Sequence, residues 1–296
     1  MIMQQGRGVM AGLKADKELG TRTLSGAAVV ILIITGIYFG GLTWTIIAGV
    51  IALCSLSEYY KMLSGYMKKS APEKFRKRSS ELSPGIGYIF SLMILIASVK
   101  GSRPVLIALF LTLGVFAIFL REVLRKQLTN GNESYAMYNA GGILSGVIYI
   151  SIPWVCMILL RNYDFGSQIL MTLFACTWAC DVSAYIGGRM FGEAKFCKYV
   201  SPAKTWAGFV SGLIGSMIVN ACALYILSLP AYPLIFIGVI CGIAGQLGDL
   251  AESLIKREAD VKDSGNLIPG HGGFLDRFDS ILINGALTYL LLEVLL

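Results

Sequence analysis

The sequence predicts an all-α polytopic membrane protein with about nine transmembrane helices. Hydrophobic residues make up 55% of the 296 positions and charged residues only 15%. Soluble domains carry about 25% charged residues, so this surface is too poor in charge to face water. The composition also excludes a disordered chain, a secreted disulfide scaffold and a nucleic-acid-binding arm, so no nucleic acid is expected as a partner.

The predicted elements are nine apolar stretches, each close to the roughly 20 residues that a helix needs to cross the hydrocarbon core. Their runs are unbroken, as in Val29–Ile34 and Ile235–Ile240, whereas transmembrane strands would alternate polar and apolar residues. Gly40 and Gly41 separate the first two stretches, which predicts a tight helical hairpin. The stretches lie near residues 23–40, 42–60, 84–99, 104–120, 139–160, 168–187, 207–228, 233–250 and 278–296.

Basic residues indicate the orientation, because Lys and Arg accumulate in cytoplasmic segments of membrane proteins. With a cytoplasmic N-terminus and nine crossings, 22 of the 25 Lys and Arg residues fall inside. We therefore expect an integral protein of the cell inner (plasma) membrane. The inner loop 61–83 is especially basic, which serves either to attract anionic lipid headgroups or, more simply, as a topology signal alone.

A first dense polar region covers residues 181–208. Asp181 lies inside the sixth apolar stretch, where a carboxylate is costly and is either a functional group or the partner of a nearby cation. Ser201, Lys204 and Thr205 precede the seventh stretch. Hydroxyls, free N–H groups and a lysine at a helix start suit a phosphate, although Ser-Pro is also an ordinary helix start.

A second polar region covers residues 248–279. If the eighth helix continues past the membrane, Asp249, Glu252 and Lys256 share one face by their spacing. Side chains of Lys and Arg suit phosphate oxygens. The two polar regions supply Lys204, Lys256, Arg257, Lys262 and Arg277.

Three carboxylates are the candidate metal ligands. Asp249, Asp276 and Asp279 offer hard oxygen atoms, which suit Mg²⁺ shared with substrate phosphates. Asp276 and Asp279 begin the ninth helix, where carboxylates also simply stabilise the helix start. Nearby, Pro269–Gly273 forms a flexible turn around His271, which is the only histidine and is either a phosphate contact or a turn hydrogen-bonder. These residues predict a membrane enzyme that handles phosphates with Mg²⁺ at its cytoplasmic face.

The second region also carries a family resemblance. The 27 residues from Ser253 to Asp279 resemble the signature of the phosphatidate cytidylyltransferases, also called CDP-diacylglycerol synthases. The pattern Asp181…Ala-Tyr…Gly-Arg…Phe-Gly192 and the segment Ser201-Pro-x-Lys-Thr205 resemble the same family. One departure is Ala207, where the family usually has Glu or Gln. The N-terminal half resembles the family only in its hydropathy.

The resemblance implies the reaction of CTP with phosphatidate to give CDP-diacylglycerol and pyrophosphate, with one or two Mg²⁺ ions. The expected metal ligands are Asp249 and Asp276, with Asp279 close by. The expected catalytic residues are Asp249, Asp276, Lys262, Asp263 and Arg277, with Asp263 orienting Lys262 or a ligand and Arg277 near the leaving group. The expected substrate-binding residues are Asp181, Ser201, Lys204, Thr205, Lys256, Arg257, His271 and Gly272.

The regions expected from this interpretation are a cytoplasmic segment 1–22, N-terminal helices in 23–160 and a catalytic membrane region 161–296. The expected partners are CTP, phosphatidate of the inner leaflet, membrane lipids and a second copy in a homodimer. A transporter would place charges at the bilayer midplane and often shows an inverted repeat, which is not evident here. A CDP-alcohol phosphotransferase lacks support because its Asp-Gly-x-x-Ala-Arg pattern is absent. A lipid-binding scaffold would not need so many acids beside bases.

Overall fold

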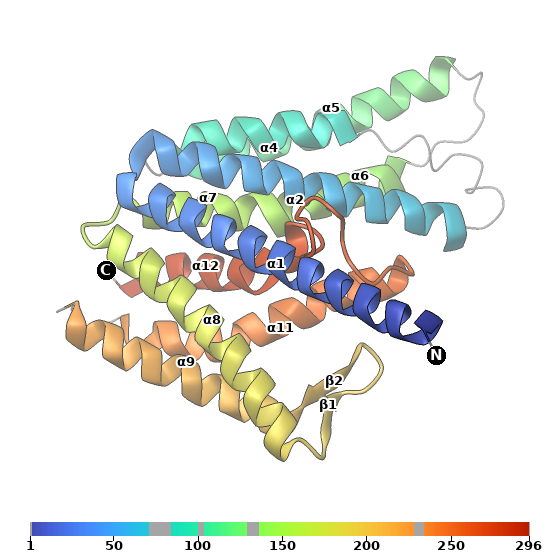
Figure 1. Cartoon of the computed structure of the whole chain (residues 1–296). Coiled ribbons are helices and arrows are strands. Elements are labelled where there is room, and N and C mark those ends of the chain that lie inside the picture. Colours follow the sequence, from blue (N-terminus) through green and yellow to red (C-terminus); the bar gives the residue numbers. More distant parts are fainter. Residues whose placement is uncertain (1, 71–83, 100–103, 129–135, 228–233, 296) are drawn as a thin grey trace.

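The computed structural model describes residues 2–70, 84–99, 104–128, 136–227 and 234–295, and it is a bundle of long helices (Figure 1). Within these ranges, eight helices are long and apolar enough to cross a membrane, and Pro84–Ser98 is a shorter apolar helix of 15 residues. The predicted all-α polytopic class is therefore confirmed. The short helix corresponds to the third predicted stretch, 84–99.

The helices follow the apolar stretches, with ends that extend beyond several of them. They are α1 (Ile2–Phe39), α2 (Gly41–Ser70), α4 (Pro84–Ser98), α5 (Pro104–Leu128), α6 (Ala136–Gly146), α7 (Ile152–Leu160), α8 (Gly166–Phe191), α9 (Trp206–Ile226), α11 (Phe236–Glu258) and α12 (Leu275–Leu295). The π-helical segment η2 (Val147–Ser151) joins α6 to α7. Pro153, two residues after the end of η2, has no N–H for a regular helical bond, so a bulge there has a local cause.

The corner between α1 and α2 is the tight hairpin that the sequence predicts. Gly40 and Gly41 have φ values of 62° and 47°, which side chains other than glycine adopt rarely. Arg161, from the loop after α7, donates its Nε–H to the carbonyl of Ile37 at 2.8 Å. This bond satisfies one of the carbonyl groups that the end of α1 leaves open.

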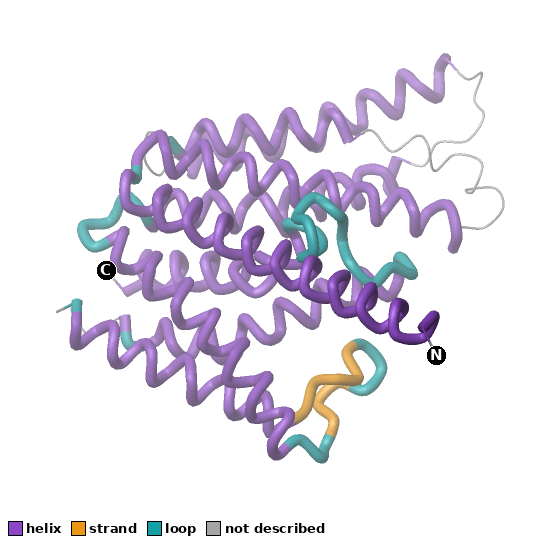
Figure 2. Tube along the Cα trace, viewed as in Figure 1, coloured by secondary structure: helices purple, strands orange, loops and turns teal. Residues whose placement is uncertain are grey.

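A short antiparallel hairpin of β1 (Lys195–Cys197) and β2 (Ser201–Thr205) separates α8 from α9. Figure 2 shows these strands in orange, at the same end of the bundle as the N-terminus, whereas the C-terminus lies at the opposite end. Opposite ends are what an odd number of crossings requires. A cytoplasmic N-terminus stays a prediction.

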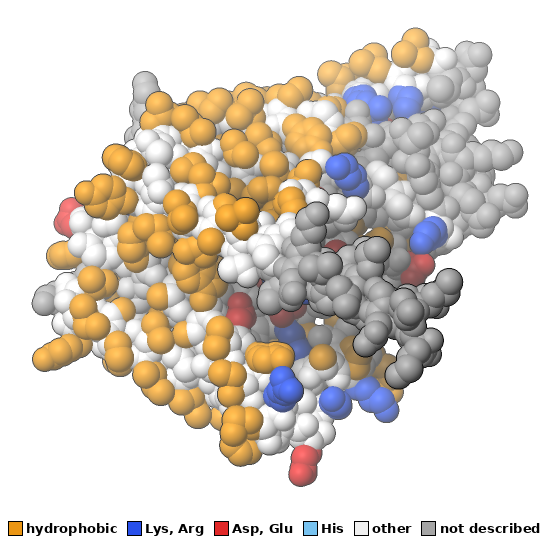
Figure 3. Space-filling view, in the orientation of Figure 1, with side chains coloured by type: hydrophobic (Ala, Val, Ile, Leu, Met, Phe, Trp, Pro, Cys, Tyr) orange, Lys and Arg blue, Asp and Glu red, His pale blue; other side chains and the backbone are white. Residues whose placement is uncertain are grey.

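Charge is uneven on the face shown in Figure 3, where hydrophobic side chains cover the helical body and Lys and Arg gather toward the hairpin end. Many large apolar side chains on α1, α5 and α9 are exposed, which is the surface that a lipid-facing helix presents. The predicted basic loop 61–83 begins as part of α2, where Lys69 pairs with Asp260 at 2.9 Å. Residues 71–83 lie outside the described residues.

Close packing in the C-terminal half positions the polar site. At Gly187, Gly208 and Gly212, a Cβ atom would lie within 3.1 Å of atoms of the facing helix, so α8 and α9 can approach only because these residues lack side chains. Buried hydrogen bonds add to this packing: Asn284 of α12 donates to Thr177 of α8 at 2.9 Å. The result is a fixed frame of α8, α9, α11 and α12 around one cavity.

Candidate active site

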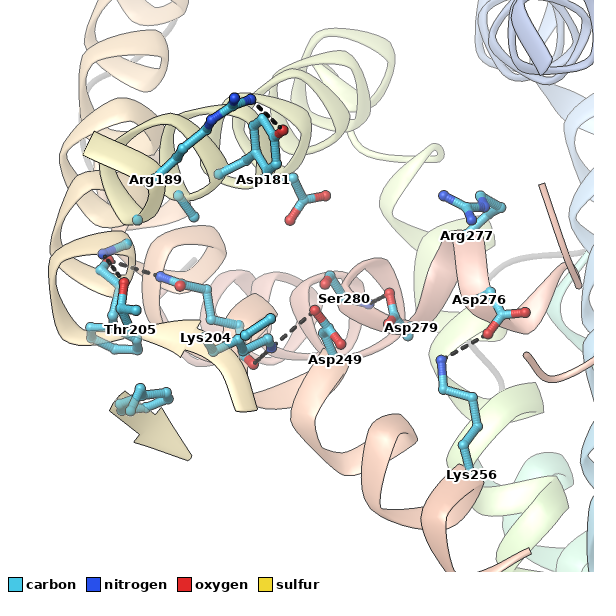
Figure 4. A pocket seen from close by; sticks show the side chains of 18 of the residues that line it. Asp181, Arg189, Lys204, Thr205, Asp249, Lys256, Asp276, Arg277, Asp279 and Ser280 are labelled. Atoms are coloured by element: carbon cyan, nitrogen blue, oxygen red, sulfur yellow. Dashed lines mark hydrogen bonds and ion pairs between the residues drawn. The ribbon is translucent and has the colours of Figure 1, made fainter. Parts of the chain in front are cut away.

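A cavity of about 620 Å³ opens between α8, the β hairpin, α11 and α12 (Figure 4). Its wall mixes acids and bases with apolar residues of α8, β2 and α9. The ionisable side chains that line it are Asp181, Arg189, Lys204, Asp249, Lys256, Asp263, Asp276, Arg277 and Asp279. The structure therefore brings both predicted polar regions together in one cavity, although Asp181 and Asp249 are 68 positions apart in the sequence.

The hairpin contributes Lys204 to this cavity. Its Nζ lies 2.9 Å from Oδ2 of Asp249 and donates to the carbonyl of Gln246 at 3.1 Å. The hydroxyl of Thr205 accepts from the amide of Gly208 at 3.1 Å and so caps the first turn of α9. Ser201 to Thr205 form a strand that leads directly into the helix start, with Thr205 as the N-cap of α9, and Ser201 does not line the cavity.

Lys256 joins two carboxylates at the other side of the cavity. Its Nζ lies 2.5 Å from Glu252 and 2.8 Å from Oδ1 of Asp276. The other oxygen of Asp276 accepts from the amide and the hydroxyl of Ser264, both at 2.9 Å, and from the amide of Gly273 at 2.8 Å. Both oxygens of Asp276 are therefore engaged by donors of the protein itself.

Asp181, Asp249 and Asp279 come from α8, α11 and α12 and face the same space (Figure 4). Each lies within electrostatic range of the other two. Asp249 accepts from Ser253 at 3.2 Å and Asp279 from the amide of Ser280 at 2.6 Å, whereas no hydrogen bond to the Asp181 carboxylate exists in the described part of the chain. Among the described residues, no three His, Cys, Asp or Glu side chains form a preassembled metal cluster.

The Pro269–Gly273 turn borders the cavity through Arg277, whose Nε–H donates to the carbonyl of His271 at 2.9 Å. His271 Nδ1 lies 2.8 Å from the hydroxyl of Ser25 on α1. Burial, together with the positive charges of Arg277 and Arg22, lowers the pKa of His271 below its usual value. Gly270 and Gly272 have φ values of 75° and 82°, so this turn needs glycine at both positions.

Five predicted site residues do not line the cavity: Ser201, Arg257, Lys262, His271 and Gly272. Arg257 donates to the carbonyl of Val200 at 3.4 Å and so connects α11 to the hairpin. Lys262 is exposed beside Asp263, which does line the cavity.

Two contacts to this region come from α1 and α2, helices in which no site residue was predicted. Ser25 on α1 reaches His271, and Glu58 on α2 accepts hydrogen bonds from the loop before α12. A usable signal existed for Glu58, because a carboxylate inside an apolar stretch is a functional candidate by default. Ser25 carries no such signal, since serine is common in membrane helices.

The fold and the cavity define a polytopic membrane protein with an acid- and base-lined pocket suited to phosphates. The model of the cytidylyltransferase family matches residues 20–295, so the chain belongs to this family.

Named relatives agree with this membership. The phosphatidate cytidylyltransferase of Bacillus subtilis (strain 168) is 31% identical over 287 residues, which are 94% of this chain and 98% of that protein. The one of Staphylococcus aureus (strain COL) is 32% identical over 265 residues, 88% of this chain and 94% of that protein. The one of Synechocystis sp. is 42% identical over 138 residues, and this match spans about half of each chain, 46% and 47%.

Proposed function

We propose that this protein transfers CMP from CTP to phosphatidate, giving CDP-diacylglycerol and pyrophosphate. The observation that carries the proposal is the single cavity in which α8, α11 and α12 place acids among Lys204, Lys256 and Arg277. Both substrates are anionic at their phosphates, and cations that line a cavity are suited to hold them. Membership of the cytidylyltransferase family and the names of the relatives support the same reaction.

The reaction needs no nucleophile from the protein. A phosphate oxygen of phosphatidate attacks the α-phosphorus of CTP, a new P–O bond forms, and the bond to pyrophosphate breaks. Catalysis of such a transfer consists mainly of positioning and charge stabilisation. We assign phosphate binding to Lys204 and Lys256, and contact with the leaving pyrophosphate to Arg277, whose guanidinium is held by the carbonyl of His271.

The donor set of the cavity fits Mg²⁺. We propose Asp181, Asp249 and Asp279 as its carboxylates, because they face one space and Asp181 has no hydrogen bond within the described residues. Asp276 belonged to the set predicted from the sequence, but its oxygens are engaged by Lys256, Ser264 and Gly273. When bound, Mg²⁺ would neutralise phosphate charge in the cavity. Whether one or two ions bind stays a prediction.

The proposal places the cavity at the cytoplasmic end of the bundle, where it meets CTP from the cytosol and phosphatidate from the inner leaflet. Its support is the positive-inside distribution of the sequence together with the position of the hairpin, on the side of the N-terminus. A homodimer and location in the inner membrane remain predictions.

The direct test is to incubate the purified protein with labelled CTP, phosphatidate and Mg²⁺ and to look for a labelled CDP-lipid. Asp249→Asn should abolish the product while the protein stays folded in detergent. Asp164→Asn, an exposed acid in the loop between α7 and α8, is the matched control and should keep full activity. Absence of product from the wild-type protein with every acyl chain tried would refute the proposal.

A further inference from the structure

Glu58 is a carboxylate buried inside the second membrane helix. Its exposed fraction is 1%, and no Lys or Arg pairs with it among the described residues. An unpaired charge in such surroundings is costly unless hydrogen bonds satisfy it. Glu58 therefore needs donors, and the loop that follows α11 supplies them.

Two backbone amides donate to Glu58 and one hydroxyl lies within hydrogen-bond distance of it, and these groups come from both ends of one loop. Oε1 accepts from the amide of Phe274 at 3.1 Å, and Oε2 accepts from the amide of Leu275 at 2.9 Å. The hydroxyl of Ser264 lies 3.1 Å from Oε2. Since Leu275 is the first residue of α12, Glu58 acts as a cap supplied by another helix, where the exposed N–H groups and the helix dipole favour a negative charge.

The loop is shaped to admit this carboxylate. A Cβ atom on Gly265 or Gly273 would lie 2.5 Å from an oxygen of Glu58, which is closer than any real contact. Glycine at these two positions lets the loop backbone close over Glu58. The signature segment is therefore folded around a side chain of the N-terminal half.

The same loop positions residues that line the cavity. Ser264 and Gly273 donate to Oδ2 of Asp276, and Oδ1 of Asp276 binds Lys256. The Ser264 hydroxyl lies within hydrogen-bond distance of both Glu58 and Asp276, at 3.1 and 2.9 Å. A shift at Glu58 would thus pass through one hydroxyl and the first turn of α12 to Asp276 and Asp279.

We infer that Glu58 is a positioning residue for the reaction proposed above. It fixes the segment 264–275 and the first turn of α12, and through them the acids and bases of the cavity. The expected effect of Glu58 on the reaction rate rests on the proposed function. The contact between Glu58 and the loop does not, so the positioning role and the proposed function can fail separately.

The test compares Glu58→Gln with a matched control, Glu122→Gln. Glutamine keeps the size of Glu58 but replaces one acceptor oxygen with an NH₂ group, which cannot accept from an amide. Glu122 on α5 is likewise a buried carboxylate, at 2% exposed, yet its partners Arg121, Arg125 and Asn139 do not line the cavity. Each variant is purified in detergent, and its rate is expressed per folded molecule.

For Glu58→Gln we expect kcat to fall by roughly 10- to 100-fold, because a displacement of about 1 Å in a catalytic group can cost a factor of 100. We also expect a several-fold rise in the Mg²⁺ concentration that gives half-maximal rate. Loss of folded protein alone would lower the measured rate in proportion but would leave the half-maximal Mg²⁺ concentration unchanged. Hydrogen exchange at the amides of Phe274 and Leu275 should become faster, and Glu122→Gln should change none of these quantities.

Unchanged exchange at both amides, or a wild-type kcat and Mg²⁺ dependence in Glu58→Gln, would overturn the inference. So would equal effects from Glu122→Gln. If Glu58→Gln does not fold, Ser264→Ala is used in its place, because this variant removes only the hydroxyl that links Glu58 to Asp276. A wild-type kcat and Mg²⁺ dependence in Ser264→Ala would also overturn the inference. If the wild-type protein makes no CDP-lipid, the proposed function fails, and the exchange measurement alone decides whether Glu58 holds the loop.

Discussion

Replacing Lys256 with methionine separates its structural role from its role in phosphate binding. Lys256, Glu252 and Asp276 are 12%, 0% and 6% exposed at their side chains, so solvent screens this trio little. Removing one partner of a buried ion pair leaves the other charge uncompensated, which costs about 3–5 kcal/mol. Lys256→Met should therefore destabilise the protein by that amount.

The structure also indicates which acid is left without a partner and so causes the loss of stability. Asp276 keeps three further donors from Ser264 and Gly273 when Lys256 is removed. Apart from the Lys256 ammonium, no donor or cation reaches the oxygens of Glu252 in the described part of the chain. Neutralising Glu252 as well, in the double variant Glu252→Gln with Lys256→Met, should recover most of the lost stability.

Unfolding of the wild-type protein, both single variants and the double variant is followed in detergent, and CDP-lipid formation is measured on each. We expect the double variant to be nearly as stable as the wild-type protein but still strongly impaired in turnover, because the cation for the phosphates is missing. A double variant as unstable as Lys256→Met would refute the assignment of the loss to Glu252. A double variant with full turnover would remove Lys256 from phosphate binding.

Three further predictions concern the hairpin and the contact with α1. Lys204→Ala should raise the apparent KM for CTP or phosphatidate and leave Asp249 without its cation; unchanged KM values for both substrates would count against the assignment. The pKa of His271 lies below its usual value of 6.5, so the unfolded state binds protons more readily, and the stability of the protein should fall as the pH drops through about 6.5. The NMR resonance of this single imidazole reports the titration midpoint directly, and Arg22→Gln should raise that midpoint. A wild-type midpoint at or above 6.5 would contradict this account. Gly26→Leu should push α1 away from the turn, because even a Cβ added at Gly26 would lie 3.2 Å from Cε1 of His271, and the same resonance should then shift.

The sequence predicted the membrane helices well because length and hydropathy are local properties of a segment. The eighth stretch was bounded at residue 250, and a shared face for the acids beyond it was expected only if the helix continued; α11 runs to Glu258, so that condition is met. Asp249, Glu252 and Lys256 consequently share a face, and the ion pair of Glu252 with Lys256 follows from their spacing.

The parts that were not predicted depend on partners far away in the chain. The β hairpin of Lys195–Cys197 and Ser201–Thr205 has neither a Gly-containing turn nor an alternating pattern that would predict it, so its strands were not expected. Asp276 was expected to bind metal because its carboxylate offers hard oxygen atoms that suit Mg²⁺. Its engagement by Ser264, twelve residues earlier, depends on how the loop folds, and no helical or strand period describes that.

The contacts of α1 and α2 with the signature loop change how the expected regions 1–22, 23–160 and 161–296 relate to one another. Ser25 and Glu58 belong to the N-terminal helices, yet they bind His271 and the first amides of α12. A buried N–H left without its acceptor costs about 1–3 kcal/mol, so the start of α12 depends on a carboxylate more than 200 residues earlier. The segment 161–296 carries the proposed chemistry, but the geometry of its loop is completed by the N-terminal half. A resemblance that is specific in one half and limited to hydropathy in the other is therefore compatible with a single functional unit, in which a few buried polar side chains of the first helices hold the site.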